Sequence, residues 1–241
     1  MKNIRVIAGK EFRGYLNSPM AYIIICVFLL VTGTFFSNYL KTISYTDTTI
    51  KGFLQLAPVL LLLFGAIITM RSLSEEKKLG TWELLLTSPV RDAEVVMGKF
   101  FAAVGIMAIM LVLTMYYPLL FAVFKAHPDW GPIWTSYLGL LLLGSAAVAI
   151  GIFVSSLTNN QIIAAVVTGG ILFALWYLNT IATANYMPKA LGQVLNYFSL
   201  KYHSDPFGIG IIDTRGVIYY LSLIALFLYA TVRSLENGRW N

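Results

Sequence analysis

The sequence predicts an all-α integral membrane protein with six transmembrane helices, and three observations support this fold class. Hydrophobic residues make up 58% of the 241 residues and charged residues only 12%, against about 25% charged in typical soluble domains. Six apolar runs approach or exceed the roughly 20 residues that a helix needs to cross about 30 Å of hydrocarbon. None of the 11 acidic residues falls inside one of these runs. Because only a helix satisfies its own backbone in lipid at this length, each run is predicted to be a transmembrane helix.

We expect residues 1–241 to form one domain, because no segment outside the apolar runs is long enough to build its own core. The predicted spans cover about residues 20–40, 53–70, 100–124, 134–157, 161–184 and 216–234. Lysine and arginine indicate their orientation, since both are enriched in cytoplasmic loops. With the N-terminus inside, the inner segments hold 11 of the 17 basic residues and the outer segments hold six. Both termini and residues 71–99 are therefore predicted to be cytoplasmic.

Residues 2–17 precede the first span and mix apolar with basic side chains. The apolar positions, at steps of four, four and three, are Ile4, Ala8, Phe12 and Tyr15. The basic residues, which fall mostly on the other side of a helix with this spacing, are Lys2, Arg5, Lys10 and Arg13. We expect an amphipathic interfacial helix that lies in the headgroup plane with its cations on lipid phosphates. The alternative is a frayed, soluble leader.

Small residues in the fourth span predict close helix packing. Ala147, Gly151 and Ser155 repeat at four-residue spacing, and such residues let helix backbones approach each other in lipid. The contact can lie within the chain or between two copies. In the third span, Pro118 removes a backbone donor and predicts a bend, which is either static or a hinge.

The outer segment 185–215 is too long for a simple turn. Pro188 suits a first helical turn, and the apolar residues that share one face after it are Leu191, Val194, Leu195 and Phe198. We expect a short helix that lies along or dips into the outer leaflet and is broken at residues 205–208. Asp213 is then placed to cap the last membrane helix.

Several kinds of chemistry are missing from the sequence. It contains no GxxxxGK[ST] phosphate loop, so the chain cannot hold ATP in that manner. His203 and Asp205 could share a metal ion, but two ligands without a third do not make a site. No ionisable residue lies deep in a predicted span, which argues against a proton-driven carrier. We therefore expect no enzymatic activity, no metal and no cofactor on this chain, and a source of energy outside it.

The charged segment 71–99 is the most informative part of the sequence. Ser72 and Glu75 fit a capping box that starts a helix where the second span ends. Gly80 interrupts this helix, and Thr81 can cap a second short helix that continues through Thr87 and ends at Ser88-Pro89. One side of the second helix carries Trp82, Leu85 and Leu86, with Glu83 beside them. Such a helix can dock in a groove on a cytoplasmic partner, or it can rest on lipid as part of a solvated loop.

Residues 75–90, EEKKLGTWELLLTSPV, closely resemble the cytoplasmic motif E-E-x-x-x-G-T-x-E-x-L-L-x-x-P of ABC-2 type transporter permeases. Further stretches resemble the gliding-motility-associated, GldF-like subgroup of these permeases. They are KEFRGYLNSPMAY, MRSLSEE, VMGKF, YLGLLLLG, SSLTNNQIIAA and VRSLENGRW. The resemblance covers nearly the whole chain.

The resemblance implies a multi-pass subunit of the bacterial cytoplasmic (inner) membrane, with both termini in the cytoplasm. Two permease subunits, the same or related chains, would pair with two separate ATPase subunits that bind ATP and Mg²⁺. The short helix would sit in a groove on the ATPase as a coupling helix. The residues that the resemblance implies for this contact are Glu75, Glu76, Gly80, Thr81, Trp82, Glu83, Leu85, Leu86 and Pro89.

The leading hypothesis is therefore a transmembrane permease subunit of an ATP-driven ABC transporter, which uses a partner's ATP hydrolysis for export or mechanical work. An envelope partner would be needed for mechanical work, membrane lipids surround the spans, and no nucleic acid partner is expected. The alternative is a membrane scaffold that binds a cytosolic protein through residues 71–99 without transport. A passive channel or secondary carrier is the third hypothesis. The substrate is not defined by the sequence.

Overall fold

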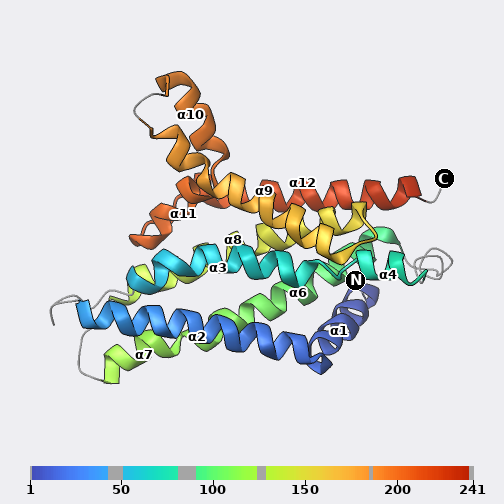
Figure 1. The fold of residues 1–241 in the computed structure, drawn as a ribbon, viewed down its shortest axis with the longest axis horizontal. Helices are drawn as coiled ribbons and strands as arrows, with labels where there is room; N and C mark the ends of the chain where they lie inside the picture. The colour runs from blue at the N-terminus through green and yellow to red at the C-terminus, as the bar shows by residue number, and fades with distance from the viewer. Residues whose placement is uncertain (1, 43–50, 81–90, 124–128, 185–186, 239–241) are drawn as a thin grey trace.

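The computed structural model describes residues 2–42, 51–80, 91–123, 129–184 and 187–238, and within these ranges the chain contains helices and no strand. Figure 1 shows the helices as one elongated bundle. Their bounds are α1 Lys2–Asn17, α2 Pro19–Thr42, α3 Lys51–Thr69, α4 Ser74–Lys78, α6 Asp92–Thr114, α7 Tyr116–Val123, α8 Trp130–Leu157, α9 Gln161–Ala182, α10 Lys189–Phe198, α11 Leu200–Gly208 and α12 Thr214–Gly238.

Six stretches of the described residues are long and apolar enough to cross a membrane, which confirms the predicted fold class. They are Pro19–Tyr39, Leu56–Lys78, Asp92–Leu120, Trp130–Leu157, Gln161–Ala182 and Thr214–Asn237. In Figure 1, α1, α4 and the end of α12 lie at one end of the bundle, and α7, α10 and α11 lie toward the other. The chain is therefore a multi-pass membrane protein, and its described ends lie at the same end of the bundle.

The third span is broken in the way that Pro118 predicts. Helix α6 ends at Thr114 and α7 begins at Tyr116, because Pro118 has no N–H to donate to the carbonyl of Thr114. The hydroxyl of Tyr117 donates to Thr32 Oγ1 on α2 at 2.8 Å, and Thr114 Oγ1 lies 3.0 Å from the hydroxyl of Tyr137 on α8. These buried contacts hold both sides of the break, so the structure favours a static bend.

Helix α8 lies at the centre of the bundle and is almost entirely buried along its second half. It contacts α3 through Ala147, Gly151 and Ser155, the three small residues of the sequence pattern. A Cβ atom on Gly151 would lie 2.0 Å from Thr69 Oγ1, and Ser155 Oγ accepts hydrogen bonds from the chain just after α3. A glycine at position 151 is what lets α8 and α3 lie this close together.

We predict that Gly151→Ala destabilises the protein by about 1–3 kcal/mol, because its methyl group overlaps Thr69 and forces the two helices apart. The measurement is the apparent Tm in detergent. The double variant Gly151→Ala/Thr69→Ala removes the overlapping hydroxyl and should recover part of the loss. Gly169→Ala is the matched control, since no atom lies within 4 Å of a Cβ built there. Equal losses in the two glycine variants would contradict the contact.

The outer segment forms two helices, and their boundary differs from the predicted one. The break between α10 and α11 is at Ser199. Its hydroxyl oxygen accepts a hydrogen bond from the backbone N–H of Tyr202 and caps α11. Pro206 lies inside α11, two residues before the helix ends at Gly208. The helix end predicted at residues 205–208 is present, and the earlier break at Ser199 was not predicted. Asp213 Oδ1 accepts a hydrogen bond from the backbone N–H of Arg215 at 2.9 Å, so the predicted cap of α12 is confirmed.

Candidate functional site

The candidate site lies where α1, α4 and α6 meet, at the end of the bundle that also carries the end of α12 (Figure 1). Helix α1 lies against α6, and glycines on α6 allow the close approach. A Cβ on Gly98 would lie 2.6 Å from Ile7, and a Cβ on Gly105 would lie 3.0 Å from Phe12. The apolar side of α1 therefore rests on protein, while Arg5 and other basic residues are exposed. Its contact with lipid headgroups stays a prediction.

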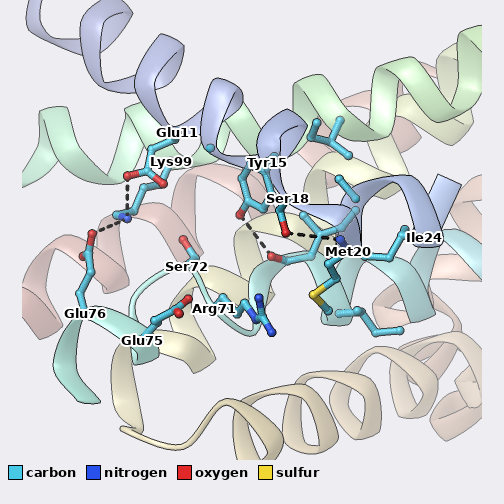
Figure 2. A pocket seen from close by; sticks show the side chains of 15 residues that line it. Glu11, Tyr15, Ser18, Met20, Ile24, Arg71, Ser72, Glu75, Glu76 and Lys99 are labelled. Atoms are coloured by element: carbon cyan, nitrogen blue, oxygen red, sulfur yellow. Dashed lines mark hydrogen bonds and ion pairs between the residues drawn. The ribbon is translucent and has the colours of Figure 1, made fainter. Parts of the chain in front are cut away.

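Lys99 joins three segments that are distant in the sequence. Its Nζ lies 3.2 Å from Glu11 Oε1 on α1 and 2.7 Å from Glu76 Oε1 on α4, as Figure 2 shows. Lys99 is only 4% exposed, and a buried ammonium group is stable only when paired. We call Glu11, Glu76 and Lys99 the ion triad. It links α1, α4 and α6 through two ion pairs.

Beside the ion triad, a hydrogen bond from Tyr15 connects α1 to the end of α3. Its hydroxyl donates to the carbonyl of Ile68 at 3.2 Å (Figure 2). Burial raises the pKa of the Tyr15 phenol above its usual value, and nearby carboxylates, Glu11 first, add to the rise. The phenol therefore stays protonated and remains a donor at any physiological pH.

The turn between α3 and α4 is held by α8. The amides of Leu73 and Ser74 donate to Ser155 Oγ at 3.1 and 3.0 Å, and the Lys77 ammonium group donates to the carbonyl of Ser156. The predicted capping box of Ser72 and Glu75 is wrong, because the N-cap of α4 is Leu73 and no side chain of the segment caps it. The backbone N–H groups of Leu73 and Ser74, at the start of α4, donate their hydrogen bonds to Ser155 of α8 instead.

The predicted coupling residues fall partly inside the described structure. Glu76 belongs to the ion triad, and Glu75 lies one residue before it on α4. Helix α4 ends at Lys78, before Gly80, which has a φ of +70° that suits a glycine. Residues 81–90 lie outside the described residues, and the short helix stays a prediction. The predicted contact residues there are Thr81, Trp82, Glu83, Leu85, Leu86 and Pro89.

The ion triad was not found from the sequence. Each of its members lies in a different one of the quoted stretches, KEFRGYLNSPMAY, MRSLSEE and VMGKF. The available signal was Lys99, a cation placed directly before an apolar run, because such a residue needs a carboxylate if it is buried. The sequence does not say which carboxylate, since Glu11 is 88 residues away and Glu76 is 23.

His203, one of the two candidate metal ligands, packs against an aromatic ring in the structure. The His203 ring stacks on Tyr219 with centroids 4.0 Å apart, and its Nδ1 lies 3.0 Å from the carbonyl of Ser199. Among the described residues, no group of three or more His, Cys, Asp or Glu side chains could hold a metal ion. His203 joins α11 to α12 in this fold.

Comparison with known protein families gives one match. The family model described as ABC-2 family transporter protein matches residues 5–205. The matched region contains the three members of the ion triad, the turn before α4 and most of α11. No curated protein matches the chain significantly.

Proposed function

The chain belongs to the ABC-2 family of transporter proteins, and we propose that it is the permease subunit that couples ATP hydrolysis by a separate ATPase to export or mechanical work. In this proposal the membrane is the bacterial cytoplasmic membrane, and both termini and residues 71–99 are cytoplasmic, as the distribution of lysine and arginine favours. Two ATPase subunits serve two permease subunits. The resemblance to the gliding-motility-associated subgroup suggests work on the cell envelope.

The observation that carries the proposal is the ion triad. The ATPase would engage residues 81–89, and α4 is the described helix that directly precedes this segment. Helix α4 is attached to α6 through Glu76 and Lys99 and to α8 through Ser155 and Lys77. Lys99 continues the connection to Glu11 on α1. A movement imposed on α4 would therefore reach two membrane helices and the N-terminal helix together.

This arrangement suits a rigid-body mechanism. The contacts of α4 are short and largely buried, so the helix cannot move far without moving its partners or breaking an ion pair. ATP-driven closure of the ATPase pair would shift residues 81–89, and α4 would pass that shift to α6 and α8. The scaffold alternative uses the same surface, but it gives no role to a connection between α4 and two spans.

We predict that a mild-detergent pull-down of the intact protein from its own cells recovers a P-loop ATPase. The variant Trp82→Ala/Glu83→Ala should lose most of it, because a buried aromatic anchor commonly contributes 2 kcal/mol or more to an interface, roughly a 30-fold change in Kd. Arg5→Gln, an exposed residue of α1, is the matched control. A folded protein that brings down no ATPase would favour the scaffold alternative.

A further inference from the structure

A cavity of about 260 Å³ lies between the N-terminal helix and the membrane helices (Figure 2). One of its walls is apolar and is formed by Met20 and Ile24 of α2, Ile67 of α3 and Ile106 of α6. The opposite face of α2 is apolar and exposed, with Ile23 61% accessible. The cavity is therefore bounded by helices that face lipid, and it lies at the end of the spans.

The other wall is polar and contains groups that the protein leaves without partners. Arg71 and Glu75 both line the cavity, and among the described residues neither side chain makes a hydrogen bond or an ion pair. Ser72 lies between them in sequence, is only 5% exposed, and its hydroxyl has no hydrogen-bond partner there. A buried unsatisfied hydroxyl costs about 1–3 kcal/mol. Arg71 is exposed and Glu75 is half-buried, so water reaches both charges, and the buried Ser72 hydroxyl beside them is the group that indicates a bound polar molecule.

The charges around the cavity select the kind of molecule. Lys99 pairs with both Glu11 and Glu76, so the ion triad keeps one net negative charge, and Arg71 and Glu75 add one cation and one anion beside it. A simple anion would satisfy Arg71 and Ser72 but would be repelled by Glu75. A simple cation would satisfy Glu75 and be repelled by Arg71. A zwitterion satisfies all three residues at once.

We propose that the cavity binds the headgroup of a phospholipid that carries both a phosphate and a primary ammonium group, as in phosphatidylethanolamine. The phosphate accepts hydrogen bonds from Arg71 and Ser72, and the ammonium group donates to Glu75. The first carbons of the chains lie on Ile24, Ile67 and Ile106. The cavity is smaller than the roughly 300–1,000 Å³ of small-molecule pockets, so it holds the headgroup and the rest of the lipid lies outside it.

This geometry predicts a preference between lipids. A choline headgroup has a cation but no N–H to donate to Glu75, and a glycerol headgroup has no cation at all. Loss of a hydrogen bond between charged groups costs about 1.5–3 kcal/mol, so phosphatidylcholine and phosphatidylglycerol should each bind roughly ten-fold or more weakly. The bound lipid would hold α1 and α2 against α3 and α6, independently of any ATPase.

The test uses the purified full chain in detergent, with delipidated protein titrated with dioleoyl phosphatidylethanolamine, phosphatidylcholine or phosphatidylglycerol and bound lipid counted by native mass spectrometry. Phosphatidylethanolamine should bind most tightly, and both Arg71→Gln and Glu75→Gln should weaken it roughly ten-fold. Arg5→Gln and Lys78→Gln, which alter exposed cations outside the cavity, should bind as the unaltered protein does.

Equal binding of the three lipids by the unaltered protein would overturn the proposal, as would unchanged affinity in Glu75→Gln. The lipid comparison needs no variant, so a failure of Arg71→Gln to fold does not affect it. Soluble glycerophosphoethanolamine is included as a competitor. If it binds as tightly as the lipid, the cavity recognises a free headgroup and the assignment to a membrane lipid is wrong. Because no ATPase is present, these outcomes are independent of the pull-down result.

Discussion

Lys99→Met is expected to lower the free energy of unfolding by about 3 kcal/mol, the largest loss that we predict for a single substitution. The change leaves Glu11 and Glu76 facing each other without their shared cation. Breaking a buried ion pair by removing one partner typically costs about 3–5 kcal/mol. The lower end of this energy range applies because the two carboxylate side chains are 25% and 22% exposed. For a chain of this size, the apparent Tm in detergent should fall by roughly 6–12 °C.

Two further variants show whether the loss comes from unpaired charge. The triple variant Glu11→Gln/Glu76→Gln/Lys99→Met removes all three charges and should recover most of the stability, since neutral replacements of buried ion pairs are often as stable as the original. Glu236→Gln breaks the pair with Arg233, whose two side chains are 42% and 59% exposed. Exposed pairs contribute about 0–1 kcal/mol, so this control should change little. A triple variant as unstable as Lys99→Met would show that packing, and not charge, is responsible.

Ser155→Ala is expected to have the second largest effect, about 2–3 kcal/mol. It removes the acceptor of two buried amides, those of Leu73 and Ser74, and each unsatisfied donor costs about 1–3 kcal/mol. The effect should be local to the turn before α4. Amide hydrogen exchange followed by mass spectrometry should therefore be faster in peptides that cover residues 70–78, while peptides from the outer half of α8 exchange at the original rate.

Ser145→Ala provides the control for this prediction. Ser145 is also buried on α8, but its hydroxyl donates to Leu141 of the same helix at 2.7 Å. Because that carbonyl already takes part in the helix, the substitution should be nearly neutral. If both serine variants exchange alike around residues 70–78, the turn does not depend on Ser155.

The sequence predicts most of the fold because the properties that decide it are local. A run of apolar residues long enough to cross a bilayer must be a helix, and all six predicted spans are present. The break at Pro118 and the cap at Asp213 are also local effects, and both are found where the sequence predicts them. The break at Ser199 was missed because Pro206 is the stronger sequence signal, although α11 continues through Pro206 to Gly208.

The candidate site depends on contacts between distant segments, and the sequence could not supply them. Ser72 and Glu75 have the spacing of a capping box, but Ser155 of α8 already accepts the amides at the start of α4. The same contact explains one member of the small-residue pattern, because position 155 provides both a small side chain and an acceptor. The ion triad likewise required knowledge of which helices meet. The family motif identified Glu76 as important without saying that its partner is Lys99.

The central claim is that α4 transmits the work of an ATPase to the membrane helices through the ion triad. The most direct test is ATP hydrolysis by the complex of this chain with its ATPase, reconstituted in lipid vesicles, compared with hydrolysis by the ATPase alone. The triple variant Glu11→Gln/Glu76→Gln/Lys99→Met should still insert, and the pull-down must first show that it still binds the ATPase, because Glu76 is also one of the contact residues that the resemblance implies. We expect the unaltered chain to stimulate hydrolysis, and we expect hydrolysis with the triple variant to fall to the rate of the ATPase alone. Full stimulation by a folded triple variant would contradict it.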